Sequence, residues 1–142
     1  MNRISRFASC AFGFSCALAL LAVLGGCASK PEIVPSKGPR QPTLASQVKI
    51  YEEQPQKYEL LGSVMVTREE GAKWDERSNA NAAFDNALAK AAAVGANGLL
   101  IGANPGEYDA RVTVGYHGKF YQVPVRGRPP VGMFQAIYVL KE

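Results

Sequence analysis

The side chains that most often carry out chemistry are sparse in this sequence and are not spaced as an active site. His117 is the only histidine, and it precedes Gly118 where two extended segments meet. A transition-metal site or Ser/His/Asp catalysis needs a neighbouring ligand or an orienting carboxylate, and His117 has neither. The sequence therefore predicts no enzyme, no metal site and no other cofactor. Four carboxylates form a cluster typical of a solvated loop, with cation or partner binding as the alternative: Glu69, Glu70, Asp75 and Glu76.

The cysteines Cys10, Cys16 and Cys27 all lie near the N-terminus, in or just after an apolar stretch at residues 7–24 that two arginines precede. A membrane-spanning helix needs about 20 apolar residues, whereas the core of a signal peptide needs about 7–15. Polar residues and a glycine interrupt the first half of this stretch, so the sequence predicts an export signal at residues 1–26. A retained N-terminal membrane helix is the alternative. Cleavage before Cys27 would leave one cysteine, which excludes an internal disulfide.

The segment Leu24-Gly25-Gly26-Cys27 resembles the lipobox of bacterial lipoproteins. The resemblance implies that the thiol of Cys27 receives a diacylglyceryl group and that Cys27 becomes the mature N-terminus. The residue that follows Cys27 is Ala28 and not Asp, which resembles the default for sorting to the outer membrane. Two or three acyl chains anchor a protein firmly, because each buried methylene contributes about 0.8 kcal/mol. We therefore expect a lipid-anchored protein of the outer membrane that faces the periplasm.

The charge of the chain does not favour binding to nucleic acid. Its formal net charge is +4, and removal of the leader with its two arginines leaves about +2. No block of like charge and no basic stripe with interleaved aromatic residues is present. We expect the membrane and another envelope protein as the partners of this chain, and no nucleic acid.

Residues 27–47 are polar and have no apolar periodicity. Such a composition predicts an extended, partly polyproline tether, whose reach at about 3.1 Å per residue is at most about 60 Å. The tether would keep the domain away from the membrane. A segment gripped by a partner is the alternative. Four prolines punctuate it: Pro31, Pro35, Pro39 and Pro42.

Residues 48–142 are expected to form one globular domain. Val48–Val66 reads as two strands around a polar turn, and Gly62 interrupts the second strand as at a β-bulge or a close approach of another chain segment. Trp74 lies in a charged loop and is expected to pack onto the domain. The second strand is predicted to place four residues on one face: Tyr58, Leu60, Val64 and Val66.

The segment Arg77–Val94 is predicted to be a core helix, with Ser78 as its N-cap and Gly95 as the left-handed residue that ends it. Its alanines allow a close approach to a sheet. Apolar residues recur at spacings of three and four, which defines one helical face: Ala80, Ala83, Phe84, Ala87, Leu88, Ala91 and Val94.

The rest of the domain is predicted to be extended. Gly98–Ala103 is a short buried strand, and Met133–Leu140 is apolar on both faces, as expected of a central strand. A turn at His117-Gly118 brings apolar residues opposite one another in a hairpin, and Pro124 makes its second strand an edge. The sequence therefore predicts an α+β fold with one helix on a mainly antiparallel sheet, in the order strand, strand, helix, strand, hairpin, strand. The predicted pairs are Tyr116 with Lys119, Val114 with Tyr121, Val112 with Val123 and Ala110 with Val125.

The stretch "LAKAAAVGANGLLIGA", residues 88–103, resembles the signature of the small YbjQ-like domains and of the related domain in the outer-membrane stress-sensor lipoproteins of the Rcs phosphorelay. The resemblance extends more loosely to "YELLGSV" at residues 58–64 and to the final strand. A lipidated cysteine followed by a proline-rich tether matches the layout of the Rcs-type sensors. The present chain lacks the disulfide cysteines of those sensors and has a longer hairpin.

Two classes of function follow. The first is a non-catalytic envelope lipoprotein that binds another protein as a scaffold or sensor. The second is a small-ligand or metal-binding module of the YbjQ-like type, which could be oligomeric. The lack of metal ligands favours the first class. Exposed residues at the hairpin tip would supply its partner surface: Tyr116, His117 and Phe120.

Overall fold

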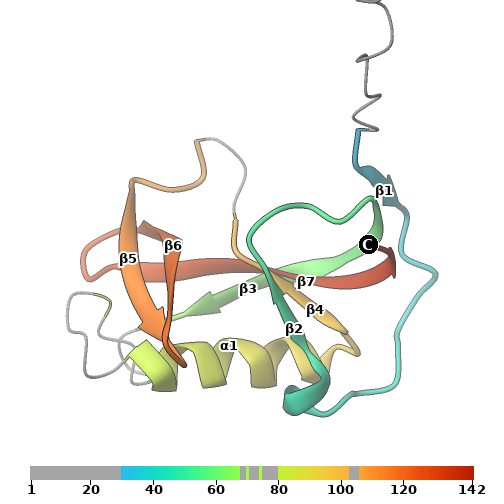
Figure 1. Cartoon of the computed structure of the whole chain (residues 1–142), viewed down its shortest axis with the longest axis horizontal. Helices are drawn as coiled ribbons and strands as arrows, with labels where there is room; N and C mark the ends of the chain where they lie inside the picture. The colour runs from blue at the N-terminus through green and yellow to red at the C-terminus, as the bar shows by residue number, and fades with distance from the viewer. Residues whose placement is uncertain (1–29, 68–69, 71–73, 75–79, 103–105) are drawn as a thin grey trace, which may run out of the picture.

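One helix packs against a face of a mixed sheet (Figure 1). The computed structural model describes residues 30–67, 70, 74, 80–102 and 106–142. The predicted α+β class is confirmed, and the predicted order of elements is preceded by one further strand and a 3-10 turn at Ala45–Gln47. The elements are β1 (Glu32–Val34), β2 (Lys49–Tyr51), β3 (Lys57–Val66), α1 (Ala80–Ala93), β4 (Gly98–Leu100), β5 (Ala110–Tyr116), β6 (Lys119–Arg126) and β7 (Val131–Lys141).

Strand β7 is central, as its apolar sequence predicts. It pairs antiparallel with β3 along one side, and with β4 and the end of β6 along the other. The two outer pairs, β1 with β3 and β2 with β4, are parallel. The strand order is β1-β3-β7-β4-β2, with the β5–β6 hairpin attached to β7 through β6. The sheet is therefore mainly antiparallel around β7, as predicted.

The β5–β6 hairpin has the predicted register, from Tyr116 opposite Lys119 to Ala110 opposite Val125. Its two turn residues are His117 and Gly118, with φ angles of 45° and 79°, as a two-residue hairpin turn requires. The prediction that Pro124 makes β6 an edge strand holds for residues 119–124, which pair only with β5, and fails at Val125 and Arg126, which also pair with β7. That pairing begins one residue after the proline, so the missing N–H is not needed.

A bulge in β3 confirms the interruption predicted at Gly62 but reverses the predicted faces. The register of β3 against β7 shifts between Leu60 and Gly62. One extra residue turns the rest of the strand over. Tyr58 therefore packs on the sheet face away from α1, whereas Val64 and Val66 pack on the α1 side. The prediction that these residues share one face with Leu60 is wrong.

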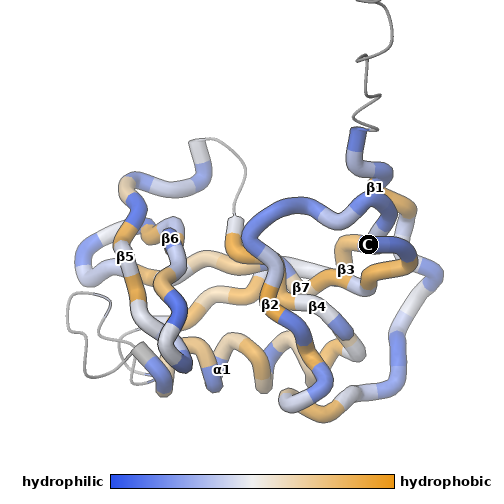
Figure 2. Tube along the Cα trace, viewed as in Figure 1, coloured by the Kyte–Doolittle hydropathy of each residue, from blue (hydrophilic) through white to orange (hydrophobic). Residues whose placement is uncertain are grey.

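The main core lies between α1 and the sheet, where apolar residues line the helix and the central strands (Figure 2). Trp74 is buried, as predicted, and its Nε1–H donates to the carbonyl of Val66 at 3.1 Å. Its ring fills the space that a side chain at Gly132 would need. The predicted helix face is confirmed at five residues, which are all buried: Ala83, Phe84, Ala87, Leu88 and Ala91.

The ends of the predicted helix differ in part from the structure. Val94 lies after the end of α1 and is 47% exposed, so its predicted place on the buried face is wrong. Gly95 has a φ of 77°, which confirms the left-handed residue expected there. Ser78, the predicted N-cap, lies outside the described residues. In the described ranges, no helix has the length and apolar character to cross a membrane.

Residues 32–47, which we call the strap, lie against the domain, although the sequence predicts a free tether there. β1 pairs with residues 57–59 of β3. Thr43 closes the end of α1, because its N–H donates to the carbonyl of Ala92 at 2.9 Å and its hydroxyl to that of Ala96 at 2.7 Å. Gly95 fits beneath the strap, where a Cβ would lie 2.7 Å from the carbonyl oxygen of Gln41. The folded unit therefore begins near Glu32 and not at Val48.

Candidate functional site

The predicted site residues are not together in the structure. Cys27, the predicted lipidation site, lies outside the described residues. His117 and Phe120 are exposed at the hairpin tip, Phe120 to 72%. Tyr116 points instead toward α1, where it stacks on Phe84 with ring centroids 4.8 Å apart. The hairpin tip therefore offers two exposed side chains, where the sequence predicts three.

Tyr116 also hydrogen-bonds to the helix. Its hydroxyl donates to a carboxylate oxygen of Asp85 at 2.9 Å. Burial, together with this carboxylate, raises the pKa of Tyr116 to about 12. Tyr116 therefore fixes the hairpin to α1 in the free protein, and it is not available as a binding residue unless this contact opens.

Of the four clustered carboxylates, only Glu70 is among the described residues. Its carboxylate contacts the ammonium group of Lys90 at 2.5 Å and accepts the backbone N–H of Thr67 at 2.9 Å. The hydrogen bond from Lys90 is the main reason that the pKa of Glu70 lies below its ordinary value. Within the described part of the chain, no group of three His, Cys, Asp or Glu side chains could hold a metal ion.

This ion pair lies at an open edge of the sheet. β1 covers only residues 57–59 of β3, and no described strand pairs with residues 60–66 on the side away from β7. The carbonyl of Met65 faces this side, because the Lys90 ammonium donates to it at 2.7 Å. Alternate residues of a strand direct their backbone groups to the same edge. The N–H and carbonyl of Ser63 therefore also face the open edge.

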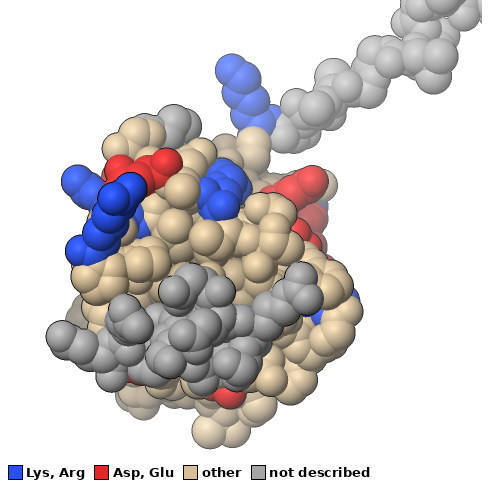
Figure 3. Space-filling view, turned by 90° about the vertical axis from the view of Figure 1, so that its left-hand side faces the viewer, with Lys and Arg blue, Asp and Glu red and all other residues tan. Residues whose placement is uncertain are grey.

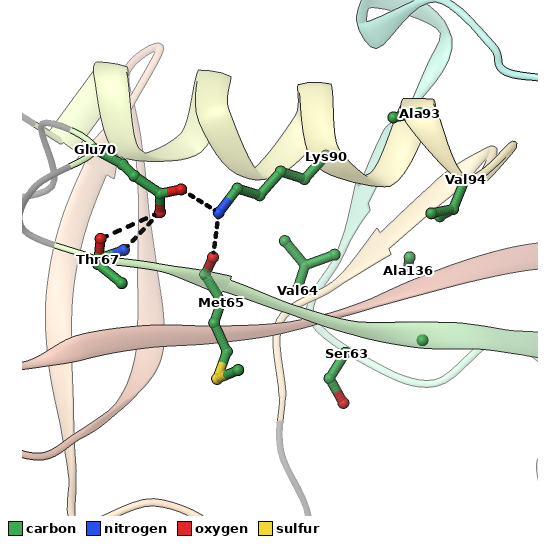
Figure 4. Close-up of a pocket in the computed structure, with 10 residues that line it drawn as sticks. Ser63, Val64, Met65, Thr67, Glu70, Lys90, Ala93, Val94 and Ala136 are labelled. Atoms are coloured by element: carbon green, nitrogen blue, oxygen red, sulfur yellow. Dashed lines mark hydrogen bonds and ion pairs between the residues drawn. The ribbon is translucent and has the colours of Figure 1, made fainter.

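A hollow of about 540 Å³ runs along this edge beneath the end of α1 (Figure 4). Its volume falls within the range of about 300–1,000 Å³ that is typical of ligand pockets. Figure 4 shows Val64 directed toward the helix between Lys90 and Val94, with the Lys90–Glu70 pair closing one end. We call this hollow the edge groove. It is lined by Gly62, Ser63, Val64, Met65, Thr67, Glu70, Lys90, Ala93, Val94 and Ala136.

The edge groove adjoins a second hollow of about 360 Å³, which has Leu61, Ala93 and Val94 in its wall. Strap residues from Ser36 to Arg40 form the rest of that wall. Ala93 and Val94 line both hollows, so the two hollows are neighbours at the end of α1.

The Lys90–Glu70 pair shapes what the edge groove can bind. A lysine placed on an open strand edge prevents uncontrolled pairing with other chains. Here Lys90 satisfies the carbonyl of Met65, and Glu70 satisfies the N–H of Thr67. Because both side chains of the pair are more than a third exposed, the pair can open at little cost. Such a site suits an extended peptide whose own backbone groups replace these two contacts.

Sequence reasoning missed the edge groove and the strap contacts. Both have one visible signal, a charged residue within a mostly apolar segment. Glu59 is the one acidic residue of β3, and Lys90 is the one basic residue of α1. Glu59 is fully buried and pairs with Arg40 of the strap at 2.9 Å. A charge that interrupts an apolar pattern therefore marks a specific partner in both places.

The charged side chains near the hairpin do not form a single patch. On the face shown in Figure 3, the described basic and acidic groups lie close to one another among uncharged residues. Arg111, for example, stacks on Tyr108, and Asp109 accepts the N–H of Gly127 at 2.8 Å. The edge groove is therefore the better-formed candidate site in the described part of the molecule.

Comparisons of the chain with protein-family models, with curated proteins and with solved structures gave no significant match.

Proposed function

We propose that this protein is a non-catalytic lipoprotein of the outer membrane, and that its domain binds an extended segment of another envelope protein in the edge groove. The lipobox-like sequence that ends at Cys27 supports the anchor. The open edge of β3 beside an apolar hollow is the observation that carries the binding function. The resemblance to the YbjQ-like and Rcs-type domains agrees with a non-catalytic sensor or scaffold.

The occupant we propose is an extended peptide because β1 already binds the same edge in that way. β1 pairs with residues 57–59, immediately before the open part of β3. A partner segment would continue along the same line, take the free backbone groups of Ser63 and place a small apolar side chain over Val64. Strand addition obtains affinity from backbone hydrogen bonds and specificity from such side-chain pockets. Confinement at a membrane raises the effective concentration of a neighbouring partner, so a small interface suffices.

A small apolar molecule is the second candidate occupant. The volume of the edge groove, about 540 Å³, and its aliphatic middle favour this possibility. It corresponds to the ligand-binding alternative suggested by the YbjQ-like resemblance. Such a ligand would make no use of the backbone groups of Ser63, and this distinguishes the two candidates.

Photo-crosslinking in intact cells tests the proposed site. A photoreactive residue at Val94, which lines the edge groove, is expected to capture a specific envelope protein. Ala89 is the matched control, because it is exposed on α1 and does not line the groove. Capture from Phe120 alone would move the partner surface to the hairpin tip. If no protein is captured and the purified lipoprotein carries a bound small molecule, the second candidate is correct.

Replacing Cys27 by alanine is expected to block lipid attachment. The thiol is the acceptor that the lipobox-like sequence implies, so the variant should lack the lipid and should accumulate as an unprocessed precursor that its apolar leader holds in a membrane. Cell fractionation and the mass of the purified protein measure both effects. Replacing Cys16, which lies within the leader, is the control and should change neither. Unchanged processing of the Cys27 variant would show that the leader is a plain signal peptide or a retained helix.

A further inference from the structure

The chain between the proposed anchor and the domain is short when the strap is docked. Only residues 28–31 separate Cys27 from β1. At about 3.3–3.6 Å per residue, the span from Cys27 to Glu32 is at most about 18 Å. The free tether predicted from the sequence would reach about 60 Å. Docking of the strap therefore changes where the domain lies relative to the membrane.

The strap is held by contacts that a free linker does not make. The guanidinium group of Arg40 pairs with the buried carboxylate of Glu59 at 2.9 Å and lies 3.6 Å above the ring of Tyr138. Thr43 makes two hydrogen bonds to the end of α1. A buried carboxylate that loses its cation is strongly destabilised. The docked state is therefore the stable state of the strap.

The sheet face near β1 carries exposed apolar side chains. Ile33 is 56% exposed, Leu60 39% and Met65 53%. Tyr58 and Ile137 pack on the face away from α1. Ile33 lies opposite Tyr58, and Leu60 lies opposite Ile137. Figure 4 shows the side chain of Met65 directed away from α1 as well. All three residues therefore belong to the same sheet face, which we call the apolar face.

Two ion pairs lie near the apolar face. Lys57 contacts Glu32 at 3.0 Å, and Lys49 contacts Glu142 at 2.7 Å. This arrangement gives no strong net charge, so contact with a membrane would not depend on anionic lipids. Apolar side chains at the level of the headgroups suffice when a lipid anchor already holds the protein there.

We propose that the docked strap holds the apolar face against the headgroup region of the anchoring membrane. This inference rests on lipidation of Cys27, as the proposed function does. The bilayer is the occupant we assign to Ile33, Leu60 and Met65, because the anchor lies within about 18 Å of Glu32, which precedes Ile33 at the start of β1.

Site-directed spin labelling of the full mature lipoprotein tests the proposal. The chain has no cysteine after Cys27, so a single new thiol can be labelled in protein bound to phosphatidylcholine vesicles. The label at L60C is expected to be several-fold less accessible to a water-soluble nickel complex than the label at A89C on α1. A Gly-Ser spacer inserted between Ala28 and Ser29 leaves the strap unchanged and should make the L60C label as accessible as the A89C label.

The outcomes distinguish failure of this inference from failure of the proposed function. Equal accessibility of the two labels in lipidated protein would overturn the inference and leave partner binding untouched. Reduced accessibility that persists with the spacer would overturn the role of the strap, because the apolar face would then bind lipid by itself. A purified mature protein without a lipid would overturn this inference together with the proposed membrane anchor, while capture of a partner at Val94 would still test the groove.

Discussion

Replacing Phe84 by alanine is expected to lower the free energy of unfolding by about 3–5 kcal/mol. Phe84 is fully buried at the centre of an aromatic cluster. Its ring centroid lies 4.8 Å from that of Tyr116, 5.2 Å from that of Tyr121 and 5.6 Å from that of Phe134. The substitution removes contacts among α1, the hairpin and β7 at once, and close-packed neighbours cannot fill the cavity. Urea denaturation of the protein without its leader measures the loss.

Phe120 provides the matched control for this experiment. It is the same residue type on the same hairpin, but its side chain is 72% exposed. Replacing Phe120 by alanine should change the free energy of unfolding by no more than about 0.5 kcal/mol. A similar loss for both variants would show that the hairpin is not packed against α1 through Tyr116 and Phe84.

Replacing Arg40 by alanine is expected to lower the free energy of unfolding by about 3 kcal/mol, because it leaves the carboxylate of Glu59 buried without its cation. Glu59 is 0% exposed, and its Oε1 atom has no hydrogen-bond partner among the described residues. Arg40 is therefore the one described side chain that offsets the cost of burying this charge. The same urea experiment measures the effect, and limited proteolysis should show earlier cleavage within the strap.

The double variant Arg40→Met with Glu59→Gln is the control for the ion pair. It removes both charges while keeping side chains of similar length, and replacing both partners of a buried pair costs far less than removing one. Most of the stability lost in Arg40→Ala should therefore return. An Arg40→Ala protein as stable as the parent would show that the strap is not docked in solution, and the proposal about the membrane would lose its basis.

The sequence predicted best those parts of the fold that depend on local periodicity. The hairpin register follows from His117-Gly118, because these turn residues fix which apolar residues face each other. The buried face of α1 follows from the spacing of three and four between Ala83 and Ala91. Both are patterns of neighbouring residues, so one sequence contains the information that they require.

The sequence did not predict features that depend on contacts between distant residues. The bulge at Leu60–Gly62 was expected at the right place, but its effect on the faces of β3 depends on the pairing with β7. The strap binds through backbone hydrogen bonds and through Arg40, which leave no periodic pattern. The edge groove exists because β1 is too short to cover β3, and this follows only from the strand order.

The same distinction applies to the candidate sites. The residue types in the lipobox-like segment and in the hairpin turn were enough to propose Cys27 as the lipid acceptor and the hairpin tip as a partner surface. Of the hairpin residues, Tyr116 is held by Asp85 and Phe84, which no turn signal could reveal. Lys90 lies in the helix predicted at Arg77–Val94, but the spacing of residues there does not indicate that it lies where an added strand would bind. A charged residue within a mostly apolar segment is the signal that would have pointed to Lys90 and to Glu59.

Amide hydrogen exchange of Ser63 is the measurement that tests strand addition at the edge groove most directly. It should be made on the full mature lipoprotein, with and without the envelope protein captured at Val94. If the partner adds a strand to β3, exchange at Ser63 and Met65 slows on binding, while exchange at His117–Phe120 does not change. Unchanged exchange at Ser63, or protection that appears at the hairpin tip instead, would contradict our account of how this protein binds its partner.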